Sequence, residues 1–176
     1  AAVLPNLVPL VAAVVGCLDP AVPNLRSGCM TAATSLLDVI VKRFPMVDFY
    51  SKQPQYLAVG TSSGSVIIYD MAAAVQWAEL KGHKGAVLAV KFSPAGGNVA
   101  TYSLADGTVK LWSITSSFFG FGSHPHCTKT ILAQSQGRPP KLTPKQMLET
   151  VGFEWKAPKI LILHRGTIAP PLPIKQ

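Results

Sequence analysis

GHKGAVLAVKFSPAGGNVATYSLADGTVKLW spans residues 82–112 and decides how the rest of the chain is interpreted. Short apolar runs alternate in it with turns rich in Gly, Pro, Ser, Asn and Asp, a pattern typical of antiparallel strands. The stretch opens on Gly82-His83 and closes on Leu111-Trp112. With the residues before it, it predicts strands over residues 46–50, 56–60, 65–70, 75–80, 86–92, 98–103 and 108–113.

The strand pattern repeats after 43 residues, since matched positions carry the same or similar residue types. A repeat of about 40–45 residues with four strands per unit is typical of β-propeller blades. The matched pairs are Val47 and Val90, Phe49 and Phe92, Gly64 and Gly107, Val66 and Val109, Ile68 and Leu111, and Tyr69 and Trp112.

The second repeat resembles the WD-repeat family, in which a histidine, a strand serine or threonine, a turn aspartate and a strand tryptophan form a buried hydrogen-bond chain. The resemblance implies that His83, Asp106 and Trp112 are three members of this chain. The fourth is Thr101 or Ser103, because one extra residue before Asp106 leaves the register open. A buried carboxylate needs hydrogen-bond partners. We therefore interpret these residues as structural rather than as a nucleophilic triad.

The first repeat, residues 46–80, departs from this pattern. It has no Gly-His pair, and Ser63 stands where the turn aspartate belongs. Tyr69-Asp70 replaces the usual Trp-Asp. We expect this repeat to form a blade that lacks the hydrogen-bond chain.

Residues 1–45 have a helical period instead. We expect one helix over residues 7–18, ending before Pro20, and a second over residues 23–44, ending at Pro45. The pair is similar to one unit of a HEAT or armadillo solenoid. The apolar stripe of the second helix is predicted to comprise Leu25, Cys29, Ala32, Leu36, Ile40 and Phe44, widened by Leu37 and Val41.

The expected fold class is therefore mixed: an N-terminal α-helical hairpin of HEAT or armadillo type, followed by all-β WD-repeat blades of a partial propeller. The helical pair spans residues 1–45 and two blades span 46–133. A basic, proline-containing linker follows at 134–147, and a β-hairpin with an extended, proline-rich tail occupies 148–176. Because propellers close with about 4–8 blades, we expect the remaining blades to come from the same protein or from another chain.

Composition limits the possible functions. The chain has 176 residues and a net charge of +8, and residues 114–176 hold eight basic and two acidic groups. Three widely spaced cysteines fit a reducing compartment, with Cys17 and Cys29 expected in the core. No cofactor is expected, and His124, His126 and Cys127 lack the further ligands of a metal site. Residues 1–18 are uncharged but too short and proline-containing for a membrane span.

The whole arrangement resembles the C-terminal region of the rabconnectin beta subunit family. The resemblance rests on RFPMVDFY (43–50), YLAVGTSSGSVIIYDM (56–71), residues 82–112, the SSFFGFG loop (116–122) and a late hairpin (153–166). It implies a non-catalytic cytoplasmic scaffold, peripheral on vesicle or endosomal membranes. It also implies pairing with the rabconnectin alpha subunit and binding to the proton-pumping V-ATPase, whose assembly and vesicle acidification such proteins support.

The other readings belong to different functional classes. No phosphate-binding glycine loop or HExxH motif indicates an enzyme, and no small-molecule substrate is expected. The basic C-terminal third could instead bind anionic lipid or nucleic acid, with nucleic acid the weaker case. A vesicle coat or tether is a further alternative. Loops and rims carry most binding on such scaffolds, which makes Lys81, Lys84, Phe118, Phe119 and Phe121 the candidate interaction surface.

Overall fold

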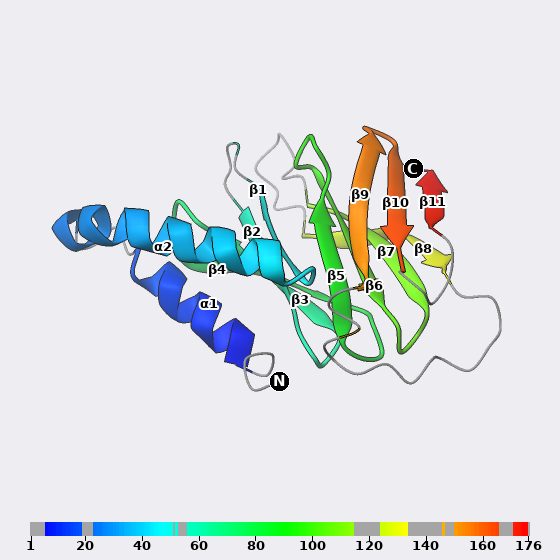
Figure 1. Ribbon diagram of the computed structural model, residues 1–176, viewed down its shortest axis with the longest axis horizontal. Helices are drawn as coiled ribbons and strands as arrows, with labels where there is room; N and C mark the ends of the chain where they lie inside the picture. The colour runs from blue at the N-terminus through cyan, green and yellow to red at the C-terminus, as the bar shows by residue number, and fades with distance from the viewer. Residues whose placement is uncertain are drawn as a thin grey trace.

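The computed structural model places two helices at one end of the molecule and three antiparallel sheets beside them (Figure 1). It describes residues 6–18, 23–50, 52, 56–114, 124–133, 146, 150–165 and 171–175. The helices are α1 (Leu7–Gly16) and α2 (Pro23–Arg43). The strands are β1 (Val47–Tyr50), β2 (Tyr56–Gly60), β3 (Ser65–Asp70), β4 (Val75–Lys81), β5 (Val87–Phe92), β6 (Asn98–Ser103), β7 (Thr108–Ser113), β8 (His126–Leu132), β9 (Gly152–Ala157), β10 (Ile160–His164) and β11 (Leu172–Lys175).

The first two sheets are four-stranded meanders with the orders β1-β2-β3-β4 and β5-β6-β7-β8. Each is one unit of the 43-residue repeat. The tight turns between their middle strands use Gly64 at φ 95° and Gly107 at φ 63°, a conformation that glycine adopts without a steric penalty. Gly60 pairs with Val66 in the first sheet and Tyr102 pairs with Val109 in the second, so the second turn is one residue longer.

The third sheet has the order β11-β10-β9 and uses the chain's last described residues. The sequence predicts a hairpin followed by an extended tail, and the tail pairs with β10 as a third strand. Pro173 lies opposite Ile162 on this edge strand. An edge position tolerates proline because no strand on the outer side needs its missing N–H group.

The sheets are stacked through their innermost strands, because β5 contacts β1 on one side and β9 on the other. Three cores result: one between the helices and the first sheet, one between the first and second sheets, and one between the second and third. Successive side chains of β2 point to opposite faces and so contribute to two of these cores. Leu57 and Val59 face the helices, and Ala58 faces the second sheet. This arrangement confirms the expected fold class, two helices followed by blades of a partial propeller.

The buried face of α2 differs from the predicted stripe. Ile40 and Leu37 are buried, as the widened stripe predicts, and Ala33 is buried as well. Ala32 is exposed and Leu36 is 42% exposed, which the stripe does not predict. The buried face is therefore rotated by about one residue. The helix is apolar on more than one side, and the position of the first sheet selects which side is covered.

The expected core position of Cys17 is also wrong. Cys17 is exposed, while Cys29 is half-buried. In α1 the buried residues are Leu7, Val11, Val14 and Val15, which belong to the core shared with α2 and the first sheet, whereas Cys17 follows the helix in an exposed position. Among the described residues, no helix combines the length and apolar character needed to cross a membrane.

Candidate functional site

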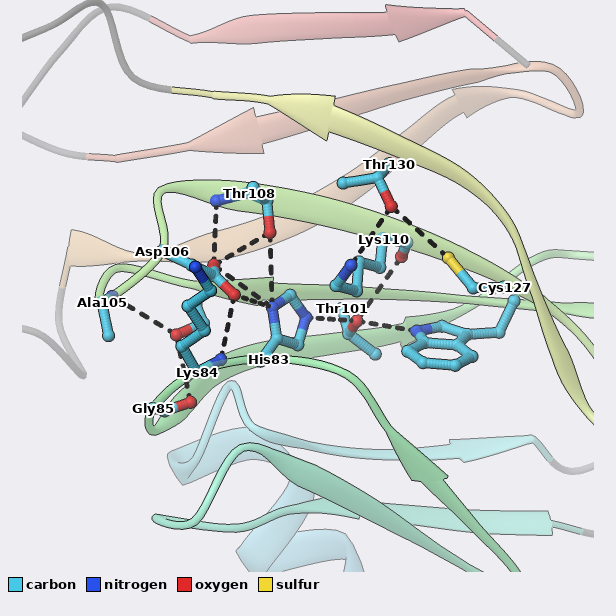
Figure 2. Close-up of polar contacts among 12 residues, drawn as sticks. His83, Lys84, Gly85, Thr101, Ala105, Asp106, Thr108, Lys110, Cys127 and Thr130 are labelled. Atoms are coloured by element: carbon cyan, nitrogen blue, oxygen red, sulfur yellow. Dashed lines mark hydrogen bonds and ion pairs between the residues drawn. The ribbon is translucent and has the colours of Figure 1, made fainter.

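A chain of buried hydrogen bonds runs through the interior of the second sheet (Figure 2). The indole Nε1 of Trp112 donates to Thr101 Oγ1 at 2.9 Å. Thr101 Oγ1 lies 2.8 Å from His83 Nε2, and His83 Nδ1 lies 3.0 Å from Asp106 Oδ2. These bonds join four segments of the second sheet: the loop before β5, strand β6, the β6–β7 turn and strand β7.

For a neutral His83, whose pKa is lowered by desolvation, the donors and acceptors of this hydrogen-bond chain follow one assignment. An indole N–H can only donate, so Thr101 Oγ1 accepts from Trp112 and donates its own proton to His83 Nε2. His83 Nδ1 then carries a proton and donates it to the Asp106 carboxylate. In this assignment the single ring proton of His83 lies on Nδ1.

Asp106 accepts several further hydrogen bonds. The backbone N–H of Lys84 donates to Oδ2 at 3.1 Å. The Thr108 hydroxyl donates to Oδ1 at 2.9 Å, and the Thr108 backbone N–H donates to the same oxygen at 3.1 Å. Figure 2 shows these groups converging on the carboxylate from the turn and from the loop before β5.

The electrostatics of this cluster favour a neutral histidine beside a charged carboxylate. Desolvation lowers the pKa of His83 from 6.5 and outweighs the opposing effect of Asp106. Burial alone would raise the pKa of Asp106, but hydrogen bonds from Thr108, His83 and the Lys84 backbone bring it below 3.8. Every side-chain polar atom of the four residues in the hydrogen-bond chain has a hydrogen-bond partner within the protein. The hydroxyl of Thr101 is fully buried, so the cluster offers no accessible nucleophile.

Ser103, the alternative fourth member, has a different role. Its hydroxyl donates to the Gly85 carbonyl at 3.1 Å and accepts from the Ala105 N–H at 3.3 Å. Thr101 is therefore the residue between His83 and Trp112. The extra residue lies in the β6–β7 turn, so Thr101 corresponds to Val59 in the first sheet and Ser103 corresponds to Thr61.

The first sheet has a group of hydroxyls in place of the chain. Thr61 Oγ1 lies 2.9 Å from Ser63 Oγ and 3.1 Å from Ser65 Oγ, and it donates to the Ser65 carbonyl. Asp70 accepts from the N–H groups of Ala72 and Ala73 in the turn after β3. These contacts stabilise local turns and do not link the sheet to the segment before it.

The candidate interaction residues are only partly described. Lys81 and Lys84 are exposed, and Lys81 forms an ion pair with Glu79 at 3.1 Å. Phe118, Phe119 and Phe121 lie outside the described residues. His124, His126 and Cys127 are exposed, and the described part of the chain contains no group of three potential metal ligands.

Sequence reasoning missed an ion pair between the first two sheets. Lys91 Nζ lies 2.7 Å from Asp48 Oδ1, and the Phe92 N–H donates to Asp48 Oδ2 at 2.8 Å. Desolvation raises the pKa of Asp48 above 3.8 despite these partners. The 43-residue repeat could have indicated this ion pair, because Asp48 and Lys91 are 43 residues apart and occupy matched positions on β1 and β5.

Comparison with known families agrees with this geometry. Residues 75–113 match the family described as WD domain, G-beta repeat. The match supports one WD40 repeat in this segment. It covers β4 to β7 and thus contains all four members of the hydrogen-bond chain. Propellers built from such repeats are typically non-enzymatic scaffolds for protein interactions.

Solved structures that match part of the chain include a β-propeller domain and two further proteins. The chain matches the β-propeller domain of Cps50 (Swd1) from Myceliophteria thermophila with a TM-score of 0.49 and 17% identity, over 76% of this chain and 37% of that one. It matches Sqt1 from Chaetomium thermophilum with a TM-score of 0.49 and 23% identity, over 74% and 33%. The designed protein Ika8 gives a TM-score of 0.49 and 18% identity, over 74% and 33%. The chain spans about a third of the length of these proteins.

Proposed function

We propose that this chain is a non-catalytic interaction module of a larger WD-repeat scaffold. The observation that carries this proposal is the WD40 repeat at residues 75–113, in which the buried His83–Asp106 pair and the Thr101 hydroxyl are fully engaged in holding the sheet together. Groups that could otherwise serve acid–base or nucleophilic chemistry are therefore structural here.

We further propose that the scaffold binds the V-ATPase and supports its assembly and vesicle acidification. The support is the resemblance of residues 43–50, 56–71 and 153–166 to the rabconnectin beta subunit family. On this proposal the protein partners are the rabconnectin alpha subunit and V-ATPase subunits. The protein would act in the cytoplasm, on the surface of vesicles or endosomes.

The test is a tagged pull-down of the protein that carries this chain from its own cells, followed by mass spectrometry. A matched sample lacks residues 46–176, which removes all three sheets. We expect V-ATPase peripheral subunits and the rabconnectin alpha subunit with the complete protein, and loss of the V-ATPase subunits from the truncated one. Lumenal pH, measured with a ratiometric dye, should rise in cells that make only the truncated form.

Other outcomes of the pull-down would indicate a binding partner other than the V-ATPase. Capture of coat or tethering subunits without the V-ATPase would contradict the acidification role and favour a coat scaffold. Recovery of nucleic acid, lost as salt increases, would favour the basic C-terminal third as the binding element. Equal V-ATPase recovery with both forms would place the binding site outside residues 46–176.

A further inference from the structure

We propose that the pocket where α2 meets the three innermost strands binds carboxylate side chains of an acidic peptide segment. The proposal deepens the scaffold function and rests on it for the statement that the ligand is a protein. The pocket has a volume of about 230 Å³. Its lining comes from the end of α2 and the turn after it (Val41, Lys42, Arg43, Pro45), from β1 (Val47, Asp48), from β5 (Val90, Lys91) and from the start of β9 (Gly152, Phe153).

The charges at this pocket favour an anion. Lys42, Arg43 and Lys91 contribute three cations, and Asp48 is the single carboxylate among the lining residues. Asp48 is 4% exposed and already accepts from Lys91 and from the Phe92 N–H, so it is compensated. The excess positive charge therefore lies on the last turn of α2.

Lys42 and Arg43 are both exposed and accessible to a ligand. Asp38 pairs with Lys42 one helical turn away, but both groups are solvent-exposed. Such a pair contributes little and is easily exchanged for a better partner. Arg43 adds a planar guanidinium group that binds a carboxylate through two parallel hydrogen bonds.

The size and shape of the pocket point to side chains of a larger partner. Sites for drug-sized molecules have volumes of roughly 300–1,000 Å³. At about 230 Å³ this pocket is smaller and accommodates one or two acidic side chains. Gly152 lines the pocket with backbone atoms alone, and a Cβ atom added there would meet no other atom within 4 Å. A peptide main chain can approach there without displacing protein atoms.

Fluorescence anisotropy with a labelled decaglutamate peptide tests the proposal, with decaglutamine as the uncharged comparison. The charge variant is Lys42→Gln with Arg43→Gln. The steric variant, Gly152→Val, fills the opening without changing charge and suits a strand position. The control, Lys52→Gln with Lys159→Gln, removes the same charge from residues just beyond the opposite ends of β1 and β9. Lys91 is left intact because its loss would leave Asp48 without its cation.

We expect decaglutamate to bind the wild-type chain and decaglutamine not to bind. Both site variants should weaken binding by about tenfold or more, and the control by about twofold or less, because a charge-assisted hydrogen bond contributes more than a long-range attraction. Thermal unfolding of each variant should match the wild type. Equal weakening in the charge variant and the control, with Gly152→Val unaffected, would show mere net-charge attraction and overturn the proposal.

Sedimentation with phosphatidylserine vesicles separates the peptide from a membrane ligand. Vesicle binding that depends on Lys42 and Arg43, without decaglutamate binding, would overturn the proposal in favour of a lipid surface. The result is also independent of the V-ATPase test. Decaglutamate binding without V-ATPase capture would support the peptide-binding pocket and contradict the V-ATPase as the partner. V-ATPase capture without decaglutamate binding would support the partner and contradict the pocket.

Discussion

Thr101 is the residue on which the polar interior of the second blade depends. Its hydroxyl is the hydrogen-bond partner of both the indole N–H of Trp112 and the Nε2 atom of His83. Both ring nitrogens lie inside the sheet, where water cannot replace a lost partner.

Thr101→Val keeps the side-chain shape and removes this hydroxyl. We expect the free energy of unfolding to fall by about 2–4 kcal/mol, since two buried groups lose their partner. Urea unfolding followed by circular dichroism measures the change. Ser103→Ala is the control and should cost about 1 kcal/mol, because Ser103 holds only the Gly85 loop and the Ala105 N–H. Equal losses in the two variants would contradict the central role of Thr101.

The pH dependence of stability follows from His83. Its pKa is lower in the folded chain than the unfolded value of 6.5, so the unfolded chain binds the extra proton more readily. The stabilisation is fully present above pH 6.5 and is lost as the pH falls through and below that value. Asp106, whose pKa is also lowered, adds a further loss below about pH 3.8.

Urea unfolding of the wild-type chain should therefore show a smaller free energy of unfolding at pH 5 than at pH 8. His83→Asn, although less stable throughout, should show a weaker dependence over the same range. A wild-type free energy that stays constant between these pH values would be incompatible with a neutral, desolvated His83.

At the scale of elements, α2 has two neighbouring apolar faces, of which only one is buried against the first sheet. The helix carries apolar residues around much of its circumference, and only the position of the first sheet decides that Leu37 is buried at 5% exposure while Leu36 is 42% exposed. Helical periodicity identifies a helix more securely than it identifies the buried side of a helix this apolar.

Leu37→Ala and Leu36→Ala distinguish the two faces. We expect Leu37→Ala to lower the free energy of unfolding by about 2–4 kcal/mol, because a buried methyl-rich side chain leaves a cavity. Leu36→Ala should change it by about 0.5 kcal/mol or less. Thermal or urea denaturation measures both. The reverse order would contradict the burial of Leu37 in the core between the helices and the first sheet.

The third sheet shows a second limit of local patterns. The tail at Leu172–Lys175 contains Pro173 and has no strong strand signal, yet it pairs with β10. Ile174 is buried against the second sheet at 2% exposure. Burial of one apolar side chain beside an available strand edge outweighs a weak local propensity.

At the scale of the whole molecule, the sheets are held in order by contacts between innermost strands. The Asp48 carboxylate is central to the first of these junctions, because it accepts from both Lys91 and the Phe92 backbone across the gap between β1 and β5. The two sheets are therefore linked by hydrogen bonds as well as by the apolar core between them.

Asp48→Ala should lower the free energy of unfolding by about 1–3 kcal/mol, since the Phe92 N–H is left buried without an acceptor. Asp38→Ala is the matched control. It also removes a carboxylate paired with a lysine, but both partners are exposed, so about 0.5 kcal/mol or less is expected. Denaturant unfolding gives both values, and similar effects would mean that the junction depends on apolar packing alone.

The sequence by itself determined seven strands of the two repeats, and its resemblance to the WD-repeat family implied the residues of the hydrogen-bond chain to within one choice. It could do so because strand alternation, turn glycines and the 43-residue repeat are local features that recur. The tertiary structure decided between Thr101 and Ser103, selected the buried face of α2, added β11 and formed the pocket where α2 meets the innermost strands. Those outcomes depend on which surface a distant segment supplies, and no local pattern specifies that neighbour.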